Sequence, residues 1–389
     1  MISRKTVLCL GLSQLMAWGV TYYLIGEFGG AIGADLGWSR DIVYGGFALA
    51  LLVMGLTSSL TGRIIDRHGG RRVMALGSLL NAAGCLGLAV CHSLTVYWIA
   101  WIVLGLGMRL TLYDAAFAAL ARIGGPGARG PMSQITLLGG LASTAFWPFG
   151  QWLTEQLGWR PALVIYAGVA LLTLPLFLAV PDGRHQDFPA KTAAEICQPL
   201  ATAPVDLLIG GGLYALIATF ANFLNAGMSA HMIAILAGQG LAASVSVWIA
   251  TLRGVGQSSA RLCEVLFGHR VDPLLLNLLA CLLMPLSFMA GLFSGQSVAA
   301  AVSFAFIYGA SNGILTITRG TLPLVLFDHR SYGSIVGRLI APSFILSAAA
   351  PIAYASVIDR FGEDGGLYLS AGCATVMLLA ALLLRLRFR

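Results

Sequence analysis

Residues 62–72 read Gly-Arg-Ile-Ile-Asp-Arg-His-Gly-Gly-Arg-Arg and separate two long apolar stretches of the chain. Four arginines and one carboxylate so close together are not expected in hydrocarbon, where each charged side chain costs about 3 kcal/mol. The glycines permit a tight turn, and the carboxylate can pair charge with neighbouring helix ends. The segment therefore predicts a loop in water between two helices that cross a membrane.

The composition of the whole chain supports this prediction. Of the 389 residues, 58% are hydrophobic and only 10% are charged, and the mean hydropathy is +0.85. Because a soluble globular domain is about 25% charged, this composition excludes a soluble enzyme, a disordered protein and a nucleic-acid-binding protein. Long continuous apolar runs favour membrane helices over a barrel, whose strands alternate polar and apolar residues.

Twelve apolar stretches are long enough to cross about 30 Å of hydrocarbon at about 1.5 Å per residue. They cover residues 6–27, 41–61, 73–91, 96–121, 133–155, 161–180, 206–229, 241–264, 273–292, 298–327, 334–358 and 366–384. We therefore predict an all-α membrane protein with twelve transmembrane helices.

The lysines and arginines predict the orientation. If both termini are cytoplasmic, sixteen of the 23 basic residues lie inside and three lie in outer loops. This positive-inside bias accounts for the net charge of +7 without an acidic partner. The chain is thus expected to be multi-pass in a bacterial inner membrane, with the first apolar stretch retained as a span. The remaining four arginines fall within predicted spans.

A proline-rich polar segment divides the chain into two halves. We predict bundles of six helices at residues 1–181 and 206–389, joined by a cytoplasmic linker at 182–205. An offset of about 203 residues overlays three pairs of glycines, which indicates an internal repeat. The pairs are Gly37 with Gly240, Gly105 with Gly309, and Gly130 with Gly333.

Soluble catalytic motifs are missing from the sequence. It contains no phosphate-binding P-loop, no zinc-ligand spacing and no nucleophile elbow, so we expect no enzyme activity, cofactor or metal. The seven cysteines are scattered without C-x-x-C spacing and are expected to pack as small apolar residues. We expect the protein to be a monomer embedded in the lipid bilayer, without a nucleic-acid partner.

The segment 62–72 resembles the signature loop of the major facilitator superfamily, G-x-x-x-D-R-x-G-R-R, with one extra residue before the last arginines. The resemblance implies a secondary active transporter with two pseudo-symmetric six-helix bundles, which works by rocker-switch alternating access. It also implies that Asp66 and Arg67 help to gate the cytoplasmic side. The second half has Cys-Glu-Val-Leu-Phe-Gly-His-Arg at 263–270 and lacks the Asp-Arg pair, so such a gate would be asymmetric.

Shorter motifs resemble bacterial members related to the monocarboxylate transporters and the oxalate:formate antiporters. They are Leu-Gly-Trp-Ser-Arg at 36–40, Leu-Tyr-Asp-Ala-Ala-Phe-Ala-Ala-Leu at 112–120, Gly-Gly-Leu-Ala-Ser-Thr-Ala-Phe-Trp-Pro at 139–148, Leu-Gly-Trp-Arg at 157–160 and Arg-Gly-Thr-Leu-Pro at 319–323. This resemblance implies a small organic anion as substrate, often a monocarboxylate, moved by symport with a proton.

The four arginines within spans are the strongest candidates for contact with an anion. Arg109 and Arg253 lie about midway along their spans and are predicted to bind substrate. Arg261 and Arg319 lie nearer the cytoplasmic ends, where a long side chain can also reach the membrane surface. We predict a role in gating or proton coupling for these two. Gln257 stands one turn before Arg261 and is expected to orient it. Because monocarboxylate transporters have an acid at a similar spacing, a proton-linked role for this helix is in doubt.

Asp114 is the one carboxylate deep in a predicted span. Its spacing from Arg109 is compatible with an internal ion pair. Alternatively, the repeat places Asp114 opposite the region of Arg319, so that the two could latch the cytoplasmic side, or Asp114 could carry the coupled proton. These three roles remain open from the sequence.

Aromatic and amide side chains complete the predicted binding cavity. The candidates are Tyr22, Tyr113, Asn222, Asn225, Tyr308 and Asn312. Each asparagine could instead join helices, because an amide without partners in hydrocarbon is costly.

Two other functions remain open. An exporter of amphipathic drugs or other toxic small molecules would use the aromatic lining more than the arginines. A non-transporting membrane sensor is the third hypothesis, and the sequence shows no soluble domain that would favour it.

Overall fold

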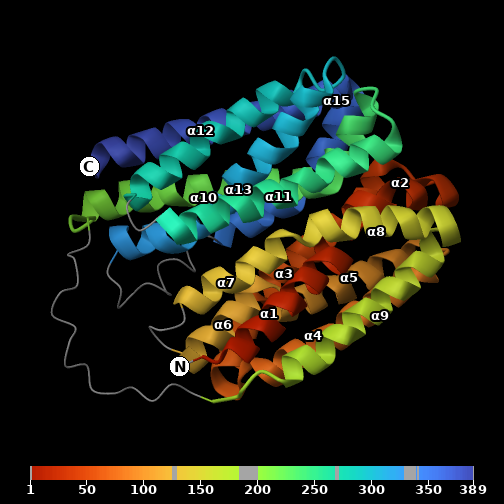
Figure 1. The fold of residues 1–389 in the computed structure, drawn as a ribbon, viewed down its shortest axis with the longest axis horizontal. Helices are drawn as coiled ribbons and strands as arrows, with labels where there is room; N and C mark the ends of the chain where they lie inside the picture. Colours follow the sequence, from red (N-terminus) through yellow and green to blue (C-terminus); the bar gives the residue numbers. More distant parts are fainter. Residues whose placement is uncertain are drawn as a thin grey trace.

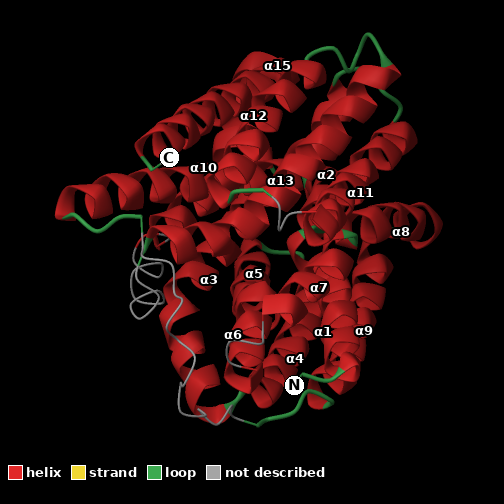
Figure 2. Ribbon diagram, turned by 60° about the vertical axis from the view of Figure 1, so that its left-hand side comes forward, coloured by secondary structure: helices red, strands yellow, loops and turns green. Residues whose placement is uncertain are grey.

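A computed structural model describes residues 2–124, 129–183, 200–267, 271–327, 339 and 341–388. Within these residues the chain is helical, with short turns and no strand (Figure 2). The first half contains α1 (Arg4–Ala17), a π-helical turn η1 (Trp18–Tyr22), α2 (Leu24–Leu36), α3 (Arg40–His68), α4 (Gly70–Ala89), α5 (Leu94–Thr111), α6 (Tyr113–Gly124), α7 (Arg129–Gly140), α8 (Ala142–Leu157) and α9 (Trp159–Leu178). The second half contains α10 (Pro204–Gly238), α11 (Ala243–Phe267), α12 (Pro273–Gly291), α13 (Val298–Leu326) and α15 (Ala341–Arg387).

These helices correspond to the twelve predicted spans. The first span consists of α1, η1 and α2, the fourth of α5 and α6, and the fifth of α7 and α8. The last two spans form α15, which bends at Gly362. Among the described residues, nine candidate spans pass a test of length and hydropathy, and α15 counts as one of them. The prediction of an all-α membrane protein is confirmed.

The segment 62–72 differs from its prediction as a loop. Helix α3 continues through Asp66 and Arg67 to His68, and α4 begins at Gly70. The turn is Gly69 alone, with φ of 83°, and its N–H donates to the carbonyl of Ile65 at 2.9 Å. Because only glycine adopts this φ readily, a single residue can reverse the chain. The side chains of Asp66 and Arg67 lie outside the described part of the structure.

The two halves form separate bundles that meet along a shared interface. In Figure 1 the red-to-yellow half lies below the green-to-blue half, and both termini lie at the same end of the molecule. The interface brings together α3 with α15, α2 with α10, and α7 and α8 with α11. The same end for both termini agrees with the prediction that they lie on one side of the membrane. The predicted linker falls largely at 184–199, outside the described residues, and its bounds remain a prediction.

The internal repeat is present in the backbone. Gly37 and Gly240 both have positive φ, of 65° and 99°. Gly158 and Gly362 form a further pair with positive φ, at a similar offset, that the sequence analysis missed. Gly105 of α5 and Gly309 of α13 each lie against a backbone carbonyl of a neighbouring helix, so a side chain at either position would collide with it. Gly333, the partner predicted for Gly130, lies outside the described residues.

The helices that line the centre of the molecule differ between the halves. In the first half, the π-helical turn interrupts the first span, extended backbone at Leu112 separates α5 from α6, and Leu141 separates α7 from α8. In the second half, α10, α11 and α13 run without a break for 35, 25 and 29 residues. At the Leu112 break, Gln14 Nε2 donates to the carbonyl of Thr111 at 2.7 Å, which satisfies a backbone group at membrane depth.

Candidate functional site

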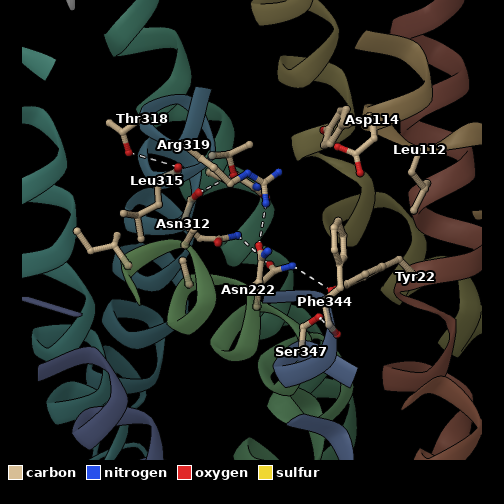
Figure 3. Close-up of a pocket in the computed structure, with 18 of the residues that line it drawn as sticks. Tyr22, Leu112, Asp114, Asn222, Asn312, Leu315, Thr318, Arg319, Phe344 and Ser347 are labelled. Atoms are coloured by element: carbon tan, nitrogen blue, oxygen red, sulfur yellow. Dashed lines mark hydrogen bonds between the residues drawn. The ribbon is translucent and has the colours of Figure 1, made fainter. Parts of the chain in front are cut away.

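A cavity of about 120 Å³ lies between the two halves. Its first-half side is formed by the interrupted spans and by α3, and its second-half side by α10, α11, α12, α13 and the start of α15. Figure 3 shows side chains that project into it from both halves. A cavity at the interface of two repeats is the usual position of a transporter substrate site.

The first half contributes an aromatic wall, which consists of Trp18, Tyr22, Tyr23 and Tyr113. The ring centroid of Trp18 lies 4.7 Å from that of Tyr22, 6.0 Å from that of Tyr23 and 5.0 Å from that of Tyr113. The interruptions position these rings, because Trp18 and Tyr22 belong to η1 and Tyr113 begins α6. The tyrosines predicted at positions 22 and 113 therefore line the cavity together.

The second half contributes an amide-arginine wall, which consists of Asn222, Asn225, Asn312, Arg261 and Arg319. Asn225 Oδ1 accepts a hydrogen bond from Asn312 Nδ2 at 3.0 Å, and Asn225 Nδ2 donates to the hydroxyl of Tyr22 at 3.2 Å. Asn222 Nδ2 donates to Ser343 Oγ at 2.9 Å. All three asparagines thus line the cavity and also join elements, and their role in substrate binding stays a prediction.

Arg319 lies on the cavity surface, contrary to the alternative in which it reaches for the membrane surface. Its Nη1 donates to Asn222 Oδ1 at 2.8 Å. In Figure 3 its guanidinium extends from α13 toward the side of the cavity that carries Asp114. The predicted direct pair between Arg319 and Asp114 is not among the ion pairs of the described residues.

Arg261 is also directed inward and is only 1% exposed. Its Nη1 donates to the carbonyl of Thr136 and lies 3.5 Å from the hydroxyl of Tyr113. Its Nε and Nη2 have no hydrogen-bond partner among the described residues. Gln257 Oε1 likewise has no such partner, so the predicted bond that would orient Arg261 is absent. Arg261 therefore carries buried donors without partners in the described residues beside the cavity.

Arg253 was predicted to contact substrate, yet the structure places it behind the cavity lining. Its Nη2 donates to Asn225 Oδ1 at 2.6 Å, and the side chain is fully buried. The guanidinium carbon lies 5.2 Å from the ring centres of Tyr23 and Tyr308. Tyr308, a second predicted binding residue, therefore packs on Arg253 and does not line the cavity in this conformation.

Asp114 and Arg109 form the ion pair predicted from their spacing. The Asp114 side chain is 44% exposed and lines the cavity, whereas that of Arg109 is 10% exposed and lies behind it. Arg109 Nη2 also lies 3.4 Å from the carbonyl of Ser58. Thus Arg109 holds Asp114 at the cavity surface and is not itself part of the lining.

Contacts between the halves close the end of the cavity that the basic residues predict to be external. Arg40 and Asp359 form an ion pair at 3.5 Å, and Ser356 Oγ donates to Asp41 Oδ1 at 3.3 Å. The rings of Tyr44 and His231 lie 4.0 Å apart between their centroids. With this end closed, the cavity lies toward the predicted cytoplasmic side.

The sequence analysis missed several polar side chains of the lining, above all Asn277 of α12. Asn277 Oδ1 accepts a hydrogen bond from Thr318 Oγ1 at 3.1 Å, and both residues line the cavity. An asparagine within an apolar stretch is the same signal that identified Asn222 and Asn225. No group of three or more His, Cys, Asp or Glu that could hold a metal occurs within the described ranges.

Comparison with known proteins gives a family and two kinds of relative. Residues 8–351 match the family model described as Major Facilitator Superfamily. Multidrug resistance protein MdtH of Klebsiella pneumoniae is 33% identical over 139 residues, which are 35% of this chain and 33% of the relative. MdtH of Cronobacter sakazakii is 37% identical over 86 residues, 22% of this chain and 21% of the relative. The matches thus span a third or less of the curated relatives.

A solved structure agrees over almost the whole chain. The crystal structure of the nucleoside transporter NupG superposes with a TM-score of 0.74 and covers 97% of this chain and 99% of its own. The sequence identity is 13%, so this likeness concerns the fold.

Proposed function

This chain belongs to the major facilitator superfamily, and we propose that it moves a small organic anion, such as a monocarboxylate, by proton-coupled alternating access. Arg261 carries the proposal, since it is a buried guanidinium at the cavity with two nitrogens that lack partners among the described residues. A buried charge without a counter-charge is costly, and a bound carboxylate would offset that cost.

The charges around the cavity support an anion over a cation. Arg261 and Arg319 belong to the lining, and Arg253 lies directly behind Asn225. Asp114 is the lining carboxylate among the described residues, and Arg109 already neutralises it. The excess of positive charge in a confined, water-poor space attracts anions and disfavours cations.

The two-bundle arrangement supports a rocker switch. With the predicted external end closed, an anion would enter or leave from the cytoplasmic side. Binding of the anion at the amide-arginine wall would lower the cost of burying these arginines when the cytoplasmic side closes. The bundles could then rock about the interface and open the opposite end.

Asp114 is the best candidate for the proton-carrying group. It is exposed to the cavity and paired with Arg109 from the same half. When the cytoplasmic side closes, the carboxylate could exchange Arg109 for Arg319 across the cavity, or it could take up the coupled proton. Asp66 and Arg67 at the end of α3 would help to close the same side.

Flux into proteoliposomes tests the proposal. Purified protein is reconstituted, and labelled lactate, benzoate and oxalate are supplied with and without an imposed pH gradient. We expect saturable uptake of at least one anion that rises when the gradient drives protons in the same direction. If no anion moves under either gradient while a neutral or cationic compound does, the proposal is wrong.

Export of amphipathic drugs is the second candidate. The relatives named multidrug resistance protein MdtH favour it, as does the aromatic wall. A drug exporter would retain activity when Arg261 becomes glutamine, whereas an anion carrier would lose it. Membership of a transporter family argues against the third hypothesis, a non-transporting sensor. A bacterial inner membrane with both termini cytoplasmic remains the proposed location.

A further inference from the structure

Trp18 lies at the centre of the aromatic wall. Its ring contacts those of Tyr22, Tyr23 and Tyr113, with centroid distances between 4.7 and 6.0 Å. The indole Nε1 is shielded from solvent and has no hydrogen-bond partner within the part of the chain that the structure describes. A buried indole N–H usually has a partner, so this unpaired donor distinguishes Trp18 from an ordinary packing residue.

Backbone irregularities place these rings at the cavity. Trp18 and Tyr22 occupy the π-helical turn, and Tyr113 follows the extended residue Leu112. Isolated π-helical turns occur frequently at functional sites, and helix breaks at membrane depth are tolerated where they face a cavity. The second half has no such break in α10, α11 or α13. The irregular backbone therefore coincides with a surface of flat rings.

Tyr113 connects this surface to the positive charge. Its ring centre lies 5.9 Å from the guanidinium carbon of Arg261, and its hydroxyl lies 3.5 Å from Arg261 Nη1. The ring centroid of Trp18 lies 5.0 Å from that of Tyr113. A ligand that contacts both Trp18 and Arg261 would therefore combine a flat group with an anionic group.

We infer that the preferred substrate is a planar aromatic or unsaturated carboxylate, whose ring stacks on Trp18 and whose carboxylate binds Arg261. The inference builds on the proposed anion transport and narrows its substrate class. Offset stacking on an indole favours a flat ring over a puckered ring of equal charge by about two- to tenfold.

Two probe anions test the inference. Benzoate and cyclohexanecarboxylate carry the same charge and ring size, but only benzoate is flat. In proteoliposomes we expect a KM for benzoate about fivefold lower than that for cyclohexanecarboxylate. The variant Trp18→Leu should abolish this ratio, whereas Trp18→Phe should retain most of it. Trp152→Leu is the matched control, because Trp152 is 54% exposed on α8 and does not line the cavity.

The outcomes distinguish a failure of this inference from a failure of the proposed anion transport on which it rests. If neither probe nor any other carboxylate moves, the proposed anion transport fails. If carboxylates move but benzoate has no advantage, or the advantage persists in Trp18→Leu, the inference alone is overturned. Binding to detergent-purified protein provides a second measurement, in which benzoate should quench tryptophan fluorescence and Trp18→Phe should remove that change. This measurement tests the contact between benzoate and Trp18 even if Trp18→Leu fails to fold.

Discussion

The two halves repeat one fold but build different sides of the cavity. The first half presents rings on interrupted helices, whereas the second half presents amides and guanidinium groups on continuous helices. Because a continuous helix satisfies its own backbone, its polar side chains can be held by one another, as Asn225 is held by Arg253 and Asn312. The difference indicates that the second half supplies the positive charge of the lining and the first half supplies its flat aromatic surface.

The largest effect is expected where the charge lies. In Arg261→Gln we expect kcat/KM for anion transport to fall by about a hundredfold, the usual cost of removing a buried charged partner. The measurement is initial uptake in proteoliposomes with equal protein orientation. Arg360→Gln is the matched control, because Arg360 is exposed beside the Gly362 bend of α15 and does not line the cavity. Equal losses in the two variants would contradict the assignment of the anion-binding charge to Arg261 of the second half.

A smaller and more selective effect is expected for Asp114, the carboxylate that the described part of the first half contributes to the cavity lining. In Asp114→Asn we expect uptake driven by a pH gradient to fall by about tenfold, since a typical coupling free energy is about 1–3 kcal/mol. Exchange of anion at equal pH should change little, because the amide keeps the shape of the side chain. Asp206→Asn removes a different ion pair, with Arg387, at the surface and should leave both rates unchanged. A loss of exchange equal to the loss of driven uptake would instead make Asp114 part of the anion site.

The two amide-arginine pairs of α10 should differ in stability. Asn225→Ala leaves the fully buried Arg253 without its acceptor, and we expect the protein to lose about 1–3 kcal/mol of stability. Asn222→Ala removes the acceptor of Arg319, which faces the cavity and can be solvated there, so the loss should be smaller. Thermal unfolding in detergent measures both. A larger shift for Asn222→Ala would contradict the placement of Arg253 behind the lining.

Much of the fold could be predicted from the sequence, because hydropathy over a span is a strong local signal. The twelve spans followed from it. The repeat followed from glycines at one common offset, and of these Gly37 and Gly240 share a positive φ. The breaks at Leu112 and Leu141 were missed, since leucine favours a helix and neither position is marked by glycine or proline at the break itself. Partners distant in sequence, such as Gln14 for Thr111, stabilise the broken backbone.

The residue types of the site could be predicted from the sequence, but the directions in which the side chains point could not. Polar side chains are rare in hydrocarbon, so the sequence marked Asn222, Asn225 and the arginines as candidates. Which arginine lies on the surface depends on helix rotation and on neighbours from other spans. Arg253 and Arg261 share α11, yet one is enclosed by Tyr23 and Tyr308 and the other faces the cavity. The position of a residue along a span therefore predicted its depth in the membrane. Packing against neighbouring helices decided whether its side chain faces the cavity.

The smallest effect is expected at the closed end, where exposed charged side chains join the two halves. Arg40 and Asp359 join them by an ion pair whose side chains are 45% and 46% exposed. Exposed pairs contribute about 0–1 kcal/mol, so Asp359→Asn should shift the population toward the open external end by no more than about fivefold. Distances between spin labels at the ends of α3 and α15 measure this population. Asp364→Asn is the matched control, because Asp364 bonds to Gln239 within the second half. Rocking separates the halves and leaves contacts within a half intact, so an equal shift in both variants would show that the end does not open by rigid rotation of the bundles.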